Sequence, residues 1–159
     1  MSVKQSIDAG FYGSNSGPTI SGGVLFRTTN IEQLIISDTE TPVLFQEIIQ
    51  LNDKLTYNEV NGTFTNSTNS PLICIISYTV SVVPTNLNGY ITSKIVFPGY
   101  YPSCGICTVE QVTGGYTEVN CTASVLLSPT QTFYIDFFQN SGVNTILSTG
   151  SSSIQICVF

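Results

Sequence analysis

Five cysteines carry the most reactive side chains in this sequence: Cys74, Cys104, Cys107, Cys121 and Cys157. Because five is odd, at least one thiol must stay free or pair with another chain. The spacing of Cys104 and Cys107 is that of redox centres and of half a zinc site. A redox thiol needs a helix N-terminus to lower its pKa, whereas prolines and paired glycines flank this motif. The flanks therefore argue against a redox centre.

The sequence also lacks the usual ligands of a zinc site. Such a site usually takes a second Cys-x-x-Cys motif or a pair of histidines, and the sequence contains no histidine. Cys74 and Cys121 could complete a four-thiolate site only if the fold brought them close. Three interpretations stay open: buried or loop thiols, a disulfide, and metal or redox use. We favour the first and expect Cys74 to be a small buried hydrophobic residue.

Other catalytic arrangements are also missing from the sequence. Without histidine, neither a Ser-His-Asp nor a Cys-His arrangement can form. No glycine-rich phosphate-binding motif is present, and no motif places two carboxylates at a defined spacing on paired strands. Asp38 and Glu40 could ligate calcium, but short acidic loops are usually only solvated. We expect a protein that is not an enzyme and has no catalytic residues, cofactor or metal.

Three triplets match the pattern for N-linked glycosylation, and they begin at Asn61, Asn66 and Asn120. Such triplets arise by chance in a chain rich in Asn, Ser and Thr. Residues 1–10 contain Lys4 and Asp8 and lack the apolar run of a signal peptide. We therefore interpret the triplets as chance matches and expect synthesis in the cytoplasm.

Composition limits the class of protein and its partners. The 159 residues are 42% hydrophobic and 9% charged, which excludes disorder of the highly charged kind. A net charge of −6 with four Lys and Arg disfavours nucleic acid and anionic membrane surfaces as partners. No apolar run approaches the roughly 18 residues of a membrane helix, so no membrane insertion is expected. We expect a flexible arm at 1–19, rich in Gly, Ser and Asn, and one domain at 20–159.

Alternation of apolar and polar residues predicts an all-β fold. The clearest strand is 72–83, where even-numbered residues from Leu72 to Val82 are apolar and share one face. Further strands are predicted at 23–28, 43–50, 90–97, 116–127, 132–140 and 152–159. Segment 31–37 fits a short helix or an edge strand, and we favour the strand. Turn signals every 8 to 12 residues predict an antiparallel β-sandwich, a jelly roll.

Two features of this sandwich predict contact surfaces. Strand 132–140 is aromatic on both faces, which points either to a second covering layer or to another subunit. Candidate interface residues are Phe133, Tyr134, Phe137, Phe138 and Phe159. Segments 98–115 and 60–70 are predicted as irregular loops that carry recognition. Candidate ligand-binding residues are Tyr100, Tyr101 and Tyr116; the alternative is that these tyrosines pack the loop against the domain.

Short motifs in the predicted strands occur in a familiar order. A Val-Leu-Phe triplet at 43–45 precedes Tyr-Asn at 57–58, a Gly at 62, a Phe at 64 and Ile-Ser-Tyr at 76–78. Leu-Leu-Ser-Pro at 126–129 then leads into the aromatic strand and an apolar terminal strand. This order resembles the tumour-necrosis-factor-like (TNF-like) jelly roll, especially its complement-type globular heads, over residues 20–159. The chain departs from that pattern at 69–74, where Asn-Ser-Pro-Leu-Ile-Cys replaces Pro-x-x-Gly-x-Tyr, and it has no collagen-like stalk.

The resemblance implies a ten-strand jelly roll and a compact trimer that recognises partners through loops and grooves between subunits. Viral fibre heads and spore-surface proteins are similar in build. We therefore expect a homotrimeric structural or receptor-binding protein on the surface of a viral particle or other array. Its expected partners are its own copies and a cell-surface receptor or glycan. The alternatives are a secreted cytokine-like or complement-like ligand domain, which is extracellular, and a small redox or zinc protein centred on Cys104 and Cys107.

Overall fold

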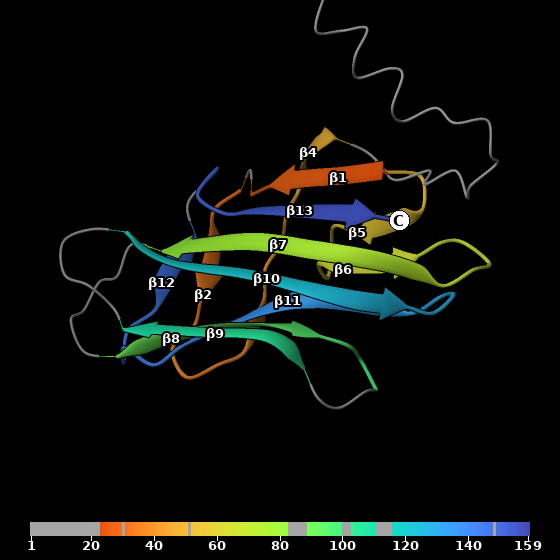
Figure 1. Ribbon diagram of the computed structural model, residues 1–159. Helices are drawn as coiled ribbons and strands as arrows, with labels where there is room; N and C mark the ends of the chain where they lie inside the picture. The colour runs from red at the N-terminus through yellow and green to blue at the C-terminus, as the bar shows by residue number, and fades with distance from the viewer. Residues whose placement is uncertain are drawn as a thin grey trace, which may run out of the picture.

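A computed structural model describes residues 23–29, 31–50, 52–82, 89–99, 103–110, 116–147 and 149–159. The regular elements in these ranges are all strands (Figure 1). They are β1 (Gly23–Thr28), β2 (Gln33–Ile35), β3 (Thr41–Pro42), β4 (Glu47–Gln50), β5 (Leu55–Asn58), β6 (Thr63–Asn66), β7 (Leu72–Val82), β8 (Tyr90–Val96), β9 (Cys104–Glu110), β10 (Thr117–Leu127), β11 (Thr132–Gln139), β12 (Thr145–Leu147) and β13 (Ser153–Val158). The arm predicted at 1–19 lies outside the described residues.

The strands form two main antiparallel sheets that pack face to face. One sheet has the order β10-β7-β13-β1-β4, and the other has the order β5-β6-β11-β8-β9 with β3 paired to β11. Strands β2 and β12 form a small separate pair. The predicted all-β antiparallel sandwich is thus confirmed, and ten strands make up the two main paths. We call them the β7 sheet and the β11 sheet.

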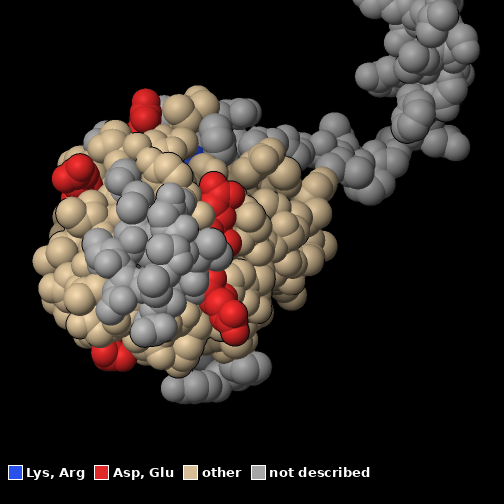
Figure 2. All heavy atoms as spheres, turned by 90° about the vertical axis from the view of Figure 1, so that its left-hand side faces the viewer, with Lys and Arg blue, Asp and Glu red and all other residues tan. Residues whose placement is uncertain are grey.

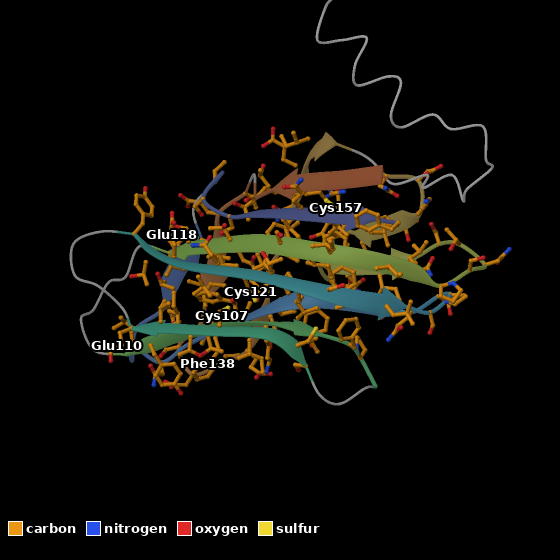
Figure 3. All side chains as sticks on the ribbon, in the orientation of Figure 1. Cys107, Glu110, Glu118, Cys121, Phe138 and Cys157 are labelled. Carbon is orange, nitrogen blue, oxygen red and sulfur yellow. The ribbon has the colours of Figure 1, made fainter. Side chains whose placement is uncertain are left out.

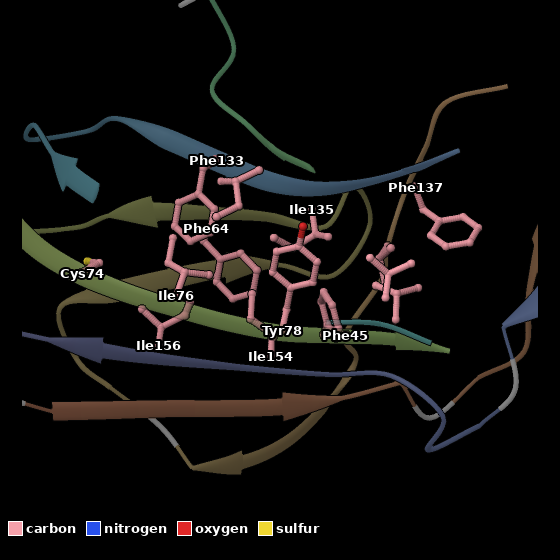
Figure 4. Packing of buried hydrophobic residues seen from close by; sticks show 14 of the residues in the cluster. Phe45, Phe64, Cys74, Ile76, Tyr78, Phe133, Ile135, Phe137, Ile154 and Ile156 are labelled. Atoms are coloured by element: carbon pink, nitrogen blue, oxygen red, sulfur yellow. The ribbon is translucent and has the colours of Figure 1, made fainter. Parts of the chain in front are cut away.

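The core lies between the two sheets, as the alternation in β7 predicts. All six even-numbered residues of β7, from Leu72 to Val82, are buried. The β11 sheet contributes aromatic rings, and Phe64 stacks on Phe133 with ring centroids 5.1 Å apart (Figure 4). Each such side chain stabilises the fold by about 2 kcal/mol through burial. The period of two in β7 therefore sets which side chains fill the sandwich.

A buried arginine joins β1 to the chain that crosses between the sheets. Arg27 donates hydrogen bonds to the carbonyl oxygens of Phe45 and Gln46, at 2.6 and 2.9 Å. Its guanidinium also lies 4.1 Å from the ring centre of Tyr57 and pairs with Glu59 at 2.9 Å. Hydrogen bonding to the guanidinium satisfies carbonyls that no neighbouring strand reaches.

The strand predicted at 43–50 is wrong in its first half, because only Glu47–Gln50 forms a strand there. The apolar triplet before it does not pair along a strand. Instead, the amide of Val43 donates to Ile135 in the β11 sheet, and the amide of Phe45 donates to the Tyr57 hydroxyl. Val43 and Phe45 are both fully buried, so their apolar character reflects the core that they cross.

Two segments predicted as loops contain strands. Segment 98–115 holds β9, and segment 60–70 holds β6. In β9 the exposed residues Ile106, Thr108 and Glu110 alternate with half-buried ones, a pattern that the surrounding Pro and Gly obscure. In β6 polar Thr and Asn surround a single apolar residue, Phe64, which is fully buried. Segment 31–37 contains β2, the strand that we favoured over a helix.

Candidate interaction surfaces

The outer face of the β7 sheet carries an apolar patch at one end, made of Ile73, Ile75, Leu126 and Phe159. Their exposed fractions are 53%, 38%, 64% and 49%. Ile73 lies opposite Leu126 in the register of β7 and β10, and the amide of Phe159 donates to the Ile73 carbonyl oxygen at 2.9 Å. Cys157 of β13 lies opposite Ile75 of β7 and extends the patch. Strands β7, β10 and β13 thus hold these side chains in one cluster.

The same face becomes polar along the strands. Ser77 and Thr122 share a hydrogen bond of 3.0 Å between their hydroxyl groups, and Thr79 donates to the Asn120 side-chain oxygen at 2.5 Å. With Gln155 these residues line an open hollow of ≈ 310 Å³. The face therefore pairs an apolar half with a half of hydroxyl and amide groups. That composition is typical of an interface with an apolar core and a polar rim.

The outer face of the β11 sheet has a charged centre. Asp136 is only 2% exposed, although Tyr134 and Phe138, two residues away on the same face of β11, are partly exposed. The Lys94 ammonium group lies 3.6 Å from the Asp136 carboxylate and also contacts Glu40. These three groups share a hollow with Tyr90 and Phe138, whose rings lie 5.9 Å apart.

The charges on this face perturb one another. Burial, with the nearby Glu40 carboxylate second, raises the pKa of Asp136 to about 6. The hydrogen bond from Lys94 lowers the pKa of Glu40, and the same bond raises the pKa of Lys94. The lysine therefore stabilises the ionised form of Glu40, while Asp136 pays the larger desolvation penalty.

The five candidate interface residues do not share one surface. Phe133 and Phe137 are fully buried in the core of their own chain, because alternate residues of β11 point toward the β7 sheet. These two rings therefore have no exposed surface that could contact another subunit. Tyr134 and Phe138 lie on the opposite side of the strand, and Phe159 belongs to the apolar patch on the other sheet. Ile73, Ile75 and Leu126 are not among the interface residues predicted from the sequence, although their positions in strands of period two could have identified them.

Of the three candidate ligand-binding tyrosines, Tyr100 and Tyr101 lie outside the described residues. Tyr116 directly precedes β10 and is 64% exposed. It lines a shallow hollow with Glu118 and Ser151 at one end of the sandwich. Glu110 and Glu118 lie at this same end (Figure 3), and Figure 2 shows carboxylates scattered across a mostly uncharged surface there. This end would repel an anionic partner.

The cysteines occupy three environments. Cys74 is fully buried on the core face of β7, as predicted, and burial raises its pKa to about 11. Cys157 lies on the outer face beside the apolar patch. Cys104, Cys107 and Cys121 are half-buried where β9 meets β10, and no disulfide joins any of the five. Among the described residues, no group of three or more Cys, Asp or Glu side chains is arranged to hold a metal.

The glycosylation triplets differ in access. Asn66 is fully buried, and its amide nitrogen donates to the carbonyl oxygens of Ser70, Leu127 and Ser128. A glycan on Asn66 would break these bonds. Asn61 and Asn120 are exposed. In the part of the chain that the structure describes, no helix is long and apolar enough to cross a membrane.

Comparison with known proteins finds similarity in structure and none in sequence. No family model matches the chain, and no curated protein matches it. The structure of murine APRIL at pH 8.5 superimposes with a TM-score of 0.62 at 10% identity, covering 87% of this chain and 99% of that one. Murine APRIL at pH 5.0 gives 0.63 at 10% identity, with coverage of 87% and 99%.

An insect protein shows the same architecture. The Eiger TNF of S. frugiperda superimposes with a TM-score of 0.52 at 7% identity, covering 87% of this chain and 92% of that one. Identities this low carry information about the fold alone. Together with the sheet order, these similarities establish that the chain folds as an antiparallel TNF-like jelly roll.

Proposed function

We propose that this protein is a homotrimeric ligand-type domain that acts outside the cell by binding a receptor, not by catalysis. The observation that carries the proposal is the apolar patch on the β7 sheet of a TNF-like fold. Large exposed apolar clusters are uncommon on monomeric proteins and mark contact sites. The structural neighbours, from a mouse and an insect, favour the ligand domain over the particle-surface role. They offer no support for a viral particle or for a glycan.

The β7 sheet suits self-association for two reasons. Three of its four apolar side chains belong to paired strands, and Phe159 is held to Ile73 by a backbone hydrogen bond, so little conformational entropy is lost when they are covered. The hydroxyl and amide groups beside them can exchange hydrogen bonds with a second copy. Three-fold association is the arrangement that the resemblance to TNF-like proteins implies.

The β11 sheet is a less favourable site for the same contact. Closing a dry interface over Tyr134 and Phe138 would also desolvate the charges of Lys94 and Glu40, which is costly. We therefore assign these two aromatic residues, together with Tyr116, to the surface available for a partner. Tyrosine is frequent at such sites because it combines apolar area with a hydroxyl group.

The substitution Leu126→Asp tests the proposed interface. A carboxylate in a dry contact between subunits would lack a partner, so the variant should be a folded monomer. Val60→Asp is the matched control, because Val60 is 89% exposed in the turn between β5 and β6 of the other sheet, and this variant should remain trimeric. Analytical ultracentrifugation measures the assembly, and circular dichroism checks the fold. A trimeric, folded Leu126→Asp variant would refute the assignment of the interface.

A further inference from the structure

Strands β9 and β10 lie side by side at the open edge of the sandwich, each at the edge of a different sheet (Figure 1). In β10 the odd-numbered residues from 117 to 127 are less exposed than the even-numbered ones. In β9 the less exposed residues include 105, 107 and 109. Cys107 and Cys121 therefore both point into the space between the sheets. Because the two edge strands converge here, short side chains suffice to span the gap.

The two thiols lie close together. The Cys107 and Cys121 side chains both pack against the buried core, and Figure 3 shows them on adjacent strands. Gly105 makes this approach possible: a Cβ atom at this position would lie 3.1 Å from the Cys121 sulfur. The Tyr78 hydroxyl donates to the Gly105 carbonyl oxygen at 2.8 Å and holds this part of β9 against the core.

We propose that Cys107 and Cys121 form an intrachain disulfide that clips the two sheets together when the protein meets an oxidising environment. A small-molecule disulfide such as oxidised glutathione serves as oxidant. One cysteine thiolate attacks it and releases one glutathione thiolate, which leaves a mixed disulfide. The second cysteine sulfur then displaces the second glutathione. Each cysteine sulfur loses one electron, and the two thiol protons end on two molecules of reduced glutathione.

The other thiols are poorly placed for this bridge. Cys74 lies on the core face of β7, and Cys157 lies on the outer face of the same sheet. Cys104 and Cys107 are three residues apart on one strand, which separates their Cα atoms by roughly 10 Å in regular geometry, beyond the range of about 7 Å for a disulfide. Cys104 to Cys121 is the remaining alternative, and the experiment below distinguishes it.

Burial also governs how fast the bridge forms. Burial, followed by the contact with Cys121, raises the pKa of Cys107 to about 11. The thiolate is the attacking species, so uncatalysed oxidation through Cys107 is slow at neutral pH and accelerates as pH rises. The clip is therefore expected to form where oxidation is sustained and not by brief exposure to air.

Thiol counting before and after equilibration with oxidised glutathione tests the proposal. The number of thiols that can be alkylated in denaturant should fall by two in the unmutated protein and in the matched control Cys104→Ser. It should not fall in Cys107→Ser or Cys121→Ser. Closing the short loop between the two strands should raise the melting temperature by roughly 5–10 °C, and dithiothreitol should reverse the shift.

Peptide mapping of the unmutated protein under non-reducing conditions gives an answer even if a serine variant fails to fold. A peptide that links Cys107 to Cys121 supports the proposal. Five free thiols after prolonged oxidation, a bridge between Cys104 and Cys121, or a link between chains through Cys157 each overturn it. Because the proposed bridge lies within one chain, its detection does not depend on whether the protein is a trimer.

Discussion

At the scale of single residues, one buried charge is placed where backbone groups lack strand partners. This charge is that of Arg27, whose guanidinium donates to two carbonyl oxygens of the crossing segment. Replacing it by Met keeps much of the apolar volume but leaves those carbonyls without their donor. We expect Arg27→Met to lower the free energy of unfolding by on the order of 3 kcal/mol, measured by urea denaturation.

Glu59→Gln provides the control for this prediction. Glu59 is 58% exposed, so its ion pair with Arg27 is well solvated and contributes less than about 1 kcal/mol. If both substitutions cost the same, the ion pair and not the backbone bonds would be the source of the stability.

The raised pKa of Asp136 predicts how the stability of the protein depends on pH. This pKa rises from an ordinary value of 3.8 to about 6 in the folded protein, so the folded state holds more protons than the unfolded state between these values. The stability contributed by Asp136 is therefore lost as pH rises from about 4 to about 6. Asp136→Asn removes this loss, and the variant should gain roughly 1–3 kcal/mol relative to the unmutated protein between pH 4 and pH 7.

Chemical denaturation of both proteins across that pH range measures the difference. Comparing the two proteins at each pH cancels the titration of groups that the substitution leaves unchanged. A free-energy difference that does not vary with pH would show that Asp136 is ionised normally in the folded protein.

At the scale of elements, the β9 strand depends on a residue that no side chain can replace without strain. Gly105 has φ 57°, in the left-handed region, and an added Cβ would crowd both Cys121 and Ile95 at 3.1 Å. Gly150 has φ 71° but nothing within 4 Å of an added Cβ. Both alanine variants carry strain of about 1 kcal/mol, and Gly105→Ala should lose about 1 kcal/mol more through crowding. Equal losses in urea denaturation would show that β9 can move away from β10.

Individual strands differ in how well the sequence predicts them. In β7 a long alternation matches the buried face from Leu72 to Val80, because one face is exposed to water and the other packs the core. In β9 the alternation is hidden by Cys and Gly, and in β6 only Phe64 marks the core. The apolar run at 43–45 is misleading, because a segment that crosses a core is as apolar as a strand. Surface patches such as Ile73 with Leu126 depend on the register between strands whose paired residues are 53 positions apart in sequence, which periodicity alone cannot supply.

At the scale of the whole molecule, the spacing of strands and turns predicts an antiparallel jelly roll, and the strand order in the two main sheets confirms it. The surface for assembly was harder to predict. Aromatic residues on both faces of β11 pointed to a subunit contact, yet one face fills the chain's own core and the other surrounds Asp136. A patch of four exposed apolar side chains lies instead on the opposite sheet, next to polar groups able to complete an interface.

The mass of the unmutated protein in solution tests the central claim most directly. Multi-angle light scattering, over a hundredfold range of concentration and under reducing conditions, separates assembly from disulfide linkage between chains. Burial of the apolar patch against neighbouring copies predicts one species with three times the chain mass of 17.1 kDa. A mass of one chain at every concentration would contradict the account, because the patch would then be left exposed to water in the functional molecule.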